Sequence, residues 1–291
     1  MRAIRVEATN GPEAALPAEV PAPAPGDHVL VDVHAAGVSF PELLMCSGQY
    51  QMRPDPPFVP GSEVAGTVVS APPGSGLGAG DRVAAFSVYG GWAERVAVPV
   101  HAVFALPPGL SFTAGAALPM NYLTGHFALV RRARLEKGET VLVHGAAGGV
   151  GTAAIQIART YGARVIAVAS SAAKRDLARQ AGADHTVDVP GFAAAVRDLT
   201  RGTGADVIVD PVGGDRVTDS LRCLRPEERL LVVGFTGGEI PSVRLNRLLL
   251  NNISVVGVAW GAYWMSRPAY LAEQLPIRHH GSGARRLAFL E

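Results

Sequence analysis

The sequence predicts an α/β protein in two parts, a β domain over residues 1–120 and a doubly wound parallel sheet over residues 121–264. Short alternating runs with many Gly and Pro residues fill the first part, whereas strands and helices alternate in the second. A glycine-rich turn, Gly145–Gly151, stands where a strand becomes a helix. At 291 residues the chain is long enough for two buried cores.

Composition excludes several classes of protein. Hydrophobic residues make up 48% and charged residues 18%, as in a globular rather than a disordered chain. With 26 basic and 25 acidic residues the formal charge is +1, so we expect neither nucleic acid nor a membrane surface as a partner. Cys46 and Cys223 are too few for a disulfide framework, which favours a reducing, cytoplasmic setting.

The first part carries the strands of the β domain. Residues 28–38 (HVLVDVHAAGV) and 95–106 (RVAVPVHAVFAL) alternate as half-buried strands do. Residues 66–86 contain a strand, a Gly/Pro turn and a second strand, and the Pro-rich residues 17–27 predict an extended connection. These segments predict a compact, irregular β domain.

From Ser111 the pattern changes to helical spacing, with Ser111 itself as a candidate N-cap. Beyond it apolar β-branched strands alternate with helices, which predicts a parallel sheet covered on both faces. The expected strands are residues 140–145, 163–170, 205–213, 229–235 and 253–260, and the expected helices are residues 150–162, 171–182, 215–225 and 243–252.

The glycine turn predicts a dinucleotide site. Ala146 takes the first position of a G-x-G-x-x-G pattern, Gly148 the second and Gly151 the third. Gly148 would let the backbone approach a pyrophosphate, and Gly151 would let the helix pack on the strand. The alternative is a tight turn without a ligand. The expected contacts are Ala147, Gly148, Gly149, Val150 and Gly151.

The end of the second strand favours NADPH over NADH. An NAD-selective sheet places an acidic residue there, but this chain has Ala169. Two hydroxyls and two cations follow, which could solvate a 2′-phosphate: Ser170, Ser171, Lys174 and Arg175. Alternatively, the serines cap the next helix and the cations are solvated on its first turn.

Several phrases of the sequence resemble the medium-chain dehydrogenase/reductase superfamily, and within it the zinc-free quinone oxidoreductase group that includes zeta-crystallin. The phrases are AAGVSFPELLMCSGQY (35–50), PPFVPGSEVAGTV (56–68), GDRVAAF (80–86), GGWAERVAVP (90–99), NYLTGHFALVRRARLEKGETVLVHGAAGGVG (121–151) and DPVGG (210–214). The resemblance implies a GroES-like β-barrel domain, a Rossmann NADPH-binding domain and an active cleft between them. It also implies that NADPH reduces quinones or related conjugated carbonyls by hydride transfer.

Two positions argue against a catalytic zinc. Zinc-dependent relatives would carry Cys where Ser39 stands and His where Ser62 stands. Zinc prefers thiolate and imidazole ligands to hydroxyls. We therefore expect no metal, and hydride transfer would rest on the cofactor and on hydrogen-bond donors to the oxygen that gains charge.

The candidate catalytic residues are polar side chains in the phrases that carry the resemblance. Ser39, Tyr50, Asn121 and Thr124 are expected to line the cleft near the nicotinamide, with Tyr122 as a further candidate. Alternatively, Tyr50 packs against a turn with its hydroxyl in water, and Asn121 caps the helix that it precedes.

Residues at the carboxyl ends of the expected strands 205–213 and 229–235 are expected to contact the nicotinamide, because ligands of open α/β sheets bind at the carboxyl ends of strands. These residues are Val212, Gly213, Phe235 and Thr236. Tight loops are the alternative. Val189 stands where NADPH-using relatives often carry a tyrosine near the adenosine phosphate. The prediction of NADPH therefore depends on Ser170, Lys174 and Arg175.

The C-terminus departs from the family. Relatives return to the barrel and end near a GKVVL strand, whereas residues 265–291 form an atypical tail, so the return segment is expected to be truncated. The apolar segment Ile253–Trp260 is expected to be the edge strand of the Rossmann sheet, and such an edge favours a homodimer. Burial of this strand under a C-terminal segment is the alternative.

These observations lead to an NADPH-dependent, zinc-independent reductase. An enoyl or alkenal double-bond reductase remains an alternative, because residues 127–151 also resemble enoyl reductase domains of polyketide synthases. A dinucleotide-binding or structural protein without activity is another, since fold does not fix function.

Overall fold

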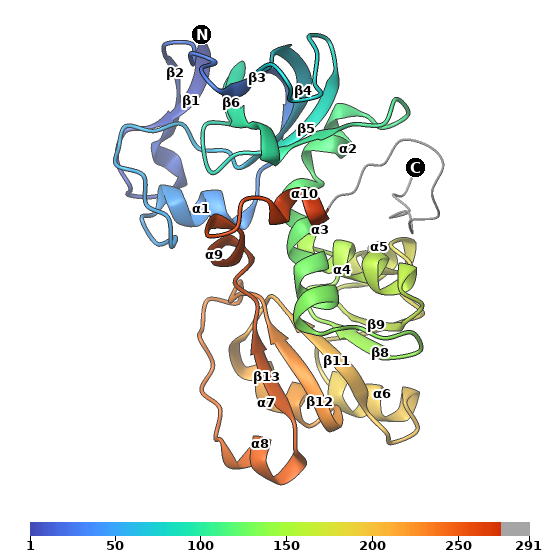
Figure 1. Cartoon of the computed structure of the whole chain (residues 1–291). Coiled ribbons are helices and arrows are strands. Elements are labelled where there is room, and N and C mark those ends of the chain that lie inside the picture. Colours follow the sequence, from blue (N-terminus) through green and yellow to red (C-terminus); the bar gives the residue numbers. More distant parts are fainter. Residues whose placement is uncertain (275–291) are drawn as a thin grey trace. The chain divides into compact units, whose positions relative to one another are not determined.

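The computed structural model describes residues 1–274. These residues form two compact units. The first unit contains Met1–Met120 and the described residues from Trp264 onward, and the second contains Asn121–Tyr263 (Figure 1).

The first unit is built on a five-stranded antiparallel sheet of order β6-β3-β4-β5-β7. The strands are β3 (His28–Ala36), β4 (Glu63–Ser70), β5 (Arg82–Phe86), β6 (Arg95–Pro99) and β7 (Val103–Ala105). A separate hairpin joins β1 (Arg2–Val6) to β2 (Ala15–Glu19). The short helices are η1 (Pro12–Ala14), α1 (Phe40–Cys46), η2 (Val100–Ala102) and α2 (Phe112–Ala116). The expected irregular β domain is confirmed.

Local sequence explains where the first unit's helices begin. Ser111 is the N-cap of α2, where its Oγ accepts from the Ala114 amide at 3.1 Å, so the expected cap is confirmed. Ser39 is the N-cap of α1 and forms a capping box with Glu42.

Residues after Trp264 pack in the first unit. Trp264 meets Phe86 edge to face with ring centroids 5.4 Å apart, and Leu271 in helix α10 (Tyr270–Gln274) is fully buried. The first residues of the expected tail are therefore part of a folded unit. The remainder of that tail, residues 275–291, lies outside the described residues.

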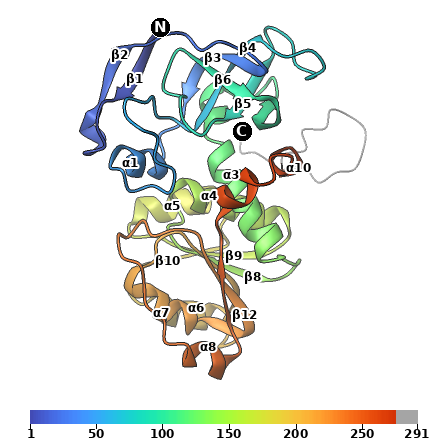
Figure 2. The same cartoon turned by 60° about the vertical axis from the view of Figure 1, so that its left-hand side comes forward.

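The second unit holds a six-stranded parallel sheet of order β10-β9-β8-β11-β12-β13. The strands are β8 (Thr140–Val143), β9 (Arg164–Val168), β10 (His185–Val187), β11 (Ala205–Asp210), β12 (Leu224–Val232) and β13 (Ser254–Gly257). Its helices include α4 (Gly149–Thr160), α5 (Ala172–Gln180), α6 (Phe192–Leu199), η4 (Gly214–Arg216), α7 (Val217–Leu221) and α8 (Asn246–Asn251). Figure 2 shows α4 and α5 on one side of the sheet and α6 and α7 on the other. This is the expected doubly wound Rossmann arrangement.

The remaining helical segments of the described residues are α3 (Pro119–His126), η3 (Phe127–Arg132) and α9 (Trp260–Met265). Within the described residues, no helix is long and apolar enough to span a membrane.

Burial explains the sequence pattern of the sheet. Every residue of β11 is buried, because helices cover both faces of a central parallel strand. Phe192 and Val196 of α6 and Val217 and Leu221 of α7 belong to one apolar cluster with strand residues of the sheet.

Four elements of the second unit differ from those expected. Strand β10 and helix α6 were not expected, and β12 begins at Leu224 rather than Arg229. The expected strand Ile253–Trp260 is wrong at both ends, since β13 covers only Ser254–Gly257 and Trp260 lies buried in α9.

Candidate cofactor and active site

The glycine turn connects the end of β8 to the start of α4. Its backbone conformation follows only in part from the G-x-G-x-x-G pattern. Gly145 adopts a left-handed conformation with φ of +56°, so the turn itself begins one residue before Ala146. The Ala146 amide donates to Val168 O of β9 at 3.3 Å. This bond fixes the turn to the neighbouring strand.

Gly151 lies against the turn. A β-carbon added there would stand 2.2 Å from Gly145 O and 2.8 Å from Ala146 Cα, both backbone atoms. The same addition at exposed Gly148 would come no closer than 3.3 Å to Gly145 O. Gly151 is thus required for packing, whereas Gly148 leaves open space at the start of the helix.

The start of α4 offers free donors to an anion. Gly148 is the N-cap and has no side chain to accept from the first turn, whose amides belong to Gly149, Val150 and Gly151. The first amides of an α-helix have no partner inside the helix, and the helix dipole adds positive potential there. Gly148 and Gly149 are exposed, so a phosphate group fits this uncapped end.

Asn121 of α3 lies beside the turn. A β-carbon on Gly149 would stand 2.3 Å from Asn121 Oδ1. Asn121 is inside α3, so the alternative in which it caps that helix is wrong. The neighbouring Tyr122 hydroxyl donates to Gln156 of α4, and Thr124 is half-buried on the same helix.

The loop after β11 adopts a bent backbone held by Asp210. The Asp210 carboxylate accepts from the amides of Val212 at 2.9 Å and Gly213 at 3.0 Å. Gly213 has φ of +69°, and a β-carbon there would lie 2.8 Å from the Phe235 ring. The loops that follow β11 and β12 are thus brought together.

Thr236 fastens the loop after β12 to the loop after β11. Its amide donates to Pro211 O at 3.1 Å and its hydroxyl donates to the same oxygen at 3.0 Å. A cavity of about 120 Å³ beside them includes Gly213 and Phe235 in its lining. All four residues expected at the nicotinamide therefore lie on these two loops, at one edge of the sheet: Val212, Gly213, Phe235 and Thr236.

His144 is a buried residue at this edge that sequence reasoning missed. Its Nε2 lies 2.8 Å from Ser220 Oγ, and that hydroxyl also donates to Arg216 O at 2.9 Å. Because the only Ser220 hydroxyl proton is used in this way, His144 Nε2 is the donor to Ser220. Burial lowers the pKa of His144 to about 4, so the ring is neutral near pH 7. Its position directly before the glycine turn is the signal that could have identified it.

The end of β9 carries the candidate phosphate ligands. Ser171 is the N-cap of α5, and its Oγ accepts from the Lys174 amide at 3.3 Å, so the capping alternative applies to this serine. Ser170 and Lys174 are exposed. Arg175 is half-buried and forms an ion pair of 3.0 Å with Asp188.

In the first unit a buried carboxylate binds both serines that stand where zinc-dependent relatives carry ligands, and a second carboxylate is buried as well. Glu42 is buried and accepts from the amide of Ser39 at 2.9 Å, from the Ser39 hydroxyl at 2.5 Å, and from the amide of Ser62 at 2.8 Å. Glu63 is buried as well and accepts from the Met120 amide at 2.9 Å. Burial is the main cause that raises the pKa of Glu63 to about 7.

Tyr50 packs beside the buried cluster of Val6, Met45, Cys46 and Phe58. Burial first, and then the charge of Glu42, raises the pKa of the Tyr50 hydroxyl. Within the described residues this hydroxyl has no hydrogen-bond partner, nor has the hydroxyl of Thr124. Both remain able to donate to a bound molecule.

No group of three His, Cys, Asp or Glu side chains is arranged to hold a metal in residues 1–274. The Ser62 hydroxyl lies near Val88 O, and the Ser39 hydroxyl is bound to Glu42. Neither position offers the soft ligands that zinc prefers.

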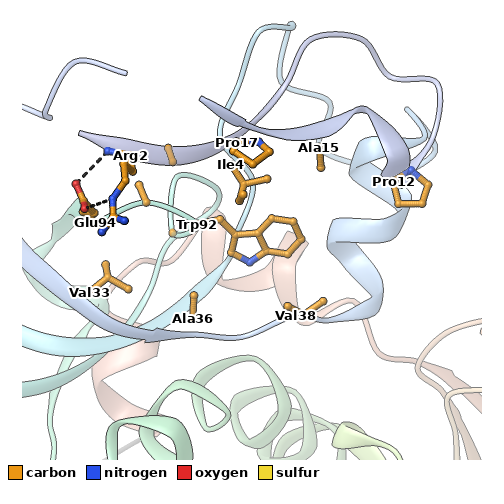
Figure 3. A pocket seen from close by; sticks show the side chains of 13 residues that line it. Arg2, Ile4, Pro12, Ala15, Pro17, Val33, Ala36, Val38, Trp92 and Glu94 are labelled. Carbon is orange, nitrogen blue, oxygen red and sulfur yellow. Dashed lines mark hydrogen bonds and ion pairs between the residues drawn. The ribbon is translucent and has the colours of Figure 1, made fainter. Parts of the chain in front are cut away.

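An open groove of about 740 Å³ lies elsewhere in the first unit. Figure 3 shows Trp92 at its centre beside Ile4 and Pro17, with the ion pair of Arg2 and Glu94 at one end. No residue of the expected site lines this groove.

Two family descriptions match the chain. "Alcohol dehydrogenase GroES-like domain" matches residues 25–108, and "Zinc-binding dehydrogenase" matches residues 149–274. The second description names a family and not a ligand set of this chain.

Relatives that match most of the chain define its family more narrowly than these two descriptions do. "Quinone oxidoreductase-like protein 2" of Rattus norvegicus is 42% identical over 84% of this chain and 71% of its own length. The structure of a "probable oxidoreductase" from Mycobacterium abscessus has a TM-score of 0.84 at 48% identity, over 94% of this chain and 84% of that one. Quinone oxidoreductase from Thermus thermophilus, solved also as its complex with NADPH, has a TM-score of 0.81 at 34% identity, over 96% and 88% of the two chains.

The fold and the uncapped glycine turn define an oxidoreductase of the GroES-like plus Rossmann class. The chain belongs to the medium-chain dehydrogenase/reductase superfamily, in its quinone oxidoreductase group.

Proposed function

We propose that the chain binds NADPH and reduces quinones or related conjugated carbonyls without a metal. The observation that carries this proposal is the glycine N-cap of α4, which leaves the first-turn amides exposed to an anion. The NADPH complex of the Thermus relative supports the choice of cofactor.

The cofactor would lie along the carboxyl edge of the second unit's sheet. Its pyrophosphate would meet Ala147, Gly148, Gly149, Val150 and Gly151, and its nicotinamide would meet Val212, Gly213, Phe235 and Thr236. Ser170, Ser171, Lys174 and Arg175 would surround the adenosine 2′-phosphate. Asp210 holds the loop after β11 through the amides of Val212 and Gly213, and His144 binds Ser220 of α7.

NADPH supplies a hydride when it is bound. The residues of the chain must then orient the acceptor and donate a hydrogen bond to the oxygen that gains negative charge. Tyr50 and Thr124 have hydroxyls that no described residue engages, so they are the strongest candidates for that donor. Ser39 donates its hydroxyl proton to Glu42, and Asn121 packs against Gly149, so these two would hold the site in shape.

A steady-state panel tests the substrate class. NADPH oxidation is followed with a benzoquinone and, in parallel, with an enoyl thioester. Turnover with the quinone supports the proposal, whereas turnover with only the thioester assigns the chain to the double-bond reductases. Binding of NADPH without turnover on either acceptor favours a binding or structural role.

We further propose a homodimer formed through β13. This strand pairs with β12 on one side, and no described strand pairs with its other side, although Arg132 Nε donates to Gly257 O at 2.9 Å. Leu245, Leu249 and Leu250, in and before the adjacent α8, are each 75% exposed, which is a large apolar area for a lone chain. Pairing with a second copy would cover both features.

A reducing compartment such as the cytoplasm fits the two cysteines. Cys46 and Cys223 are both buried and free.

A further inference from the structure

An acidic side chain stands beside the candidate 2′-phosphate ligands. Asp188 Oδ2 lies 3.0 Å from Arg175 Nη1, and the same guanidinium nitrogen is 3.4 Å from Ala169 O. Arg175 is 22% exposed and Asp188 is 50% exposed, so a ligand can reach the pair from solvent.

Sheet register explains how this acid comes to the site. Strands β9 and β10 are parallel neighbours, with Val168 opposite Val187. Ala169 and Asp188 each follow the last residue of their strand, so they lie at the same carboxyl edge. The Val189 amide donates to Asp188 Oδ1 at 2.8 Å, which orients the carboxylate and leaves Oδ2 for Arg175.

The acid thus comes from the adjacent strand, although the usual position at the end of β9 holds Ala169. A carboxylate at this edge accepts from ribose hydroxyls and repels a 2′-phosphate. It also occupies part of the guanidinium that would otherwise bind the phosphate in a two-point contact. Lys174 and Ser170 are exposed, and among the described residues neither is paired with an acid in this way.

We infer that Asp188 is a specificity-determining residue that limits the preference of this chain for a 2′-phosphorylated dinucleotide. It does so by holding Arg175 and by placing negative charge where the phosphate would bind. The inference rests on the proposed function, since it requires that the second unit binds a dinucleotide.

The substitution Asp188→Asn removes the charge and keeps a side chain of the same shape. Dissociation constants are measured by fluorescence for NADPH and NADH, and by calorimetry for 2′-phospho-ADP-ribose and ADP-ribose, which carry no nicotinamide. We expect the affinity for the two phosphorylated ligands to rise about fivefold, as for the loss of one partly exposed charge contact, with no gain for the other two.

Two variants complete the test. Asp219→Asn is the matched control, because Asp219 is 48% exposed and pairs with Arg222 at 2.6 Å in the same unit. It should leave the ratio of affinities unchanged. Arg175→Ala should weaken the binding of NADPH and 2′-phospho-ADP-ribose and leave the binding of NADH and ADP-ribose unchanged. Thermal unfolding of each variant establishes that it is folded.

If Asp188→Asn leaves the ratio of affinities for phosphorylated and unphosphorylated ligands unchanged, the inference is overturned. Weaker binding of the phosphorylated ligands would overturn it as well, because it would mean that Asp188 orients Arg175 for the phosphate. In either case the wild-type protein would still bind dinucleotides. Failure of the wild type to bind any of the four ligands would instead contradict the proposed function, and this inference with it.

Discussion

The side-chain amide of Asn121 fills the space beside Gly149. A β-carbon on Gly149 would stand 2.3 Å from Asn121 Oδ1 and 2.7 Å from its Cγ, far inside van der Waals contact. A helix that carries candidate active-site residues is thus packed directly on the turn that offers its amides to the cofactor. Changes on either side of this contact should therefore affect cofactor binding.

The substitution Gly149→Ala should weaken NADPH binding at least tenfold, because the Asn121 side chain must leave its place beside the turn to admit the methyl group. Fluorescence titration measures the loss. The double variant Gly149→Ala with Asn121→Ala removes the obstructing amide and should recover part of the affinity. Equal affinity of the single and double variants would show that this contact is not the cause.

Gly151→Ala should destabilise the fold more than Gly148→Ala. At Gly151 the new methyl would meet backbone atoms at 2.2 Å, which cannot rotate away, so we expect a loss of roughly 2 kcal/mol or more in unfolding free energy. At Gly148 the closest atom is 3.3 Å away, and the methyl would crowd the phosphate instead. Thermal unfolding and NADPH titration of both variants separate the two effects, and a stable Gly151→Ala would contradict the packing role.

Glu63 should make the first unit less stable as pH rises. Its pKa is about 7 in the fold, above its ordinary 4.5, so between these values the folded state holds the proton more tightly than the unfolded chain. The stabilisation is complete below pH 4.5 and is lost as pH rises through 7. The full change is on the order of 3 kcal/mol.

Glu63→Gln removes this titration but keeps an oxygen for the Met120 amide. The variant should therefore gain stability relative to wild type between about pH 5 and pH 8, as measured by melting temperature at each pH. The same pH dependence in both proteins would mean that the fold does not raise the pKa of Glu63.

Substitution of exposed apolar residues by lysine tests the proposed dimer. Leu249→Lys combined with Val255→Lys places two charges on the exposed face of α8 and β13, and light scattering should report a monomer where the wild type is a dimer. Leu16→Lys is the control, since Leu16 is 55% exposed on β2 of the first unit. A monomeric wild type, or a variant that stays dimeric, contradicts the proposed interface.

Much of the fold could be predicted because local sequence patterns indicate most of its helices and strands. The β-branched runs of β8, β9 and β11 and the Ser111 cap are examples. Strand β10 is only three residues long and forms by pairing with β9. Such a short segment shows no alternation of apolar and polar residues from which a strand could be predicted. The length of β13 was overestimated because the apolar run continues into a buried helix.

The site could be predicted only where the motif is contiguous. Gly151 and the helix start follow from spacing along the chain. The pairing of Arg175 with Asp188, the bond from His144 to Ser220 and the enclosure of Ser39 by Glu42 depend on how the chain folds. Tertiary structure creates these contacts, so a single sequence does not contain them.

The uncapped start of α4 is the proposed binding site of the NADPH pyrophosphate. Titration of the 291-residue chain with NADPH, followed by nicotinamide fluorescence, tests it most directly. We expect saturable binding at micromolar concentrations, and we expect Gly149→Ala to weaken it at least tenfold. An absence of binding at tens of micromolar NADPH, or binding that Gly149→Ala leaves unchanged, would contradict it.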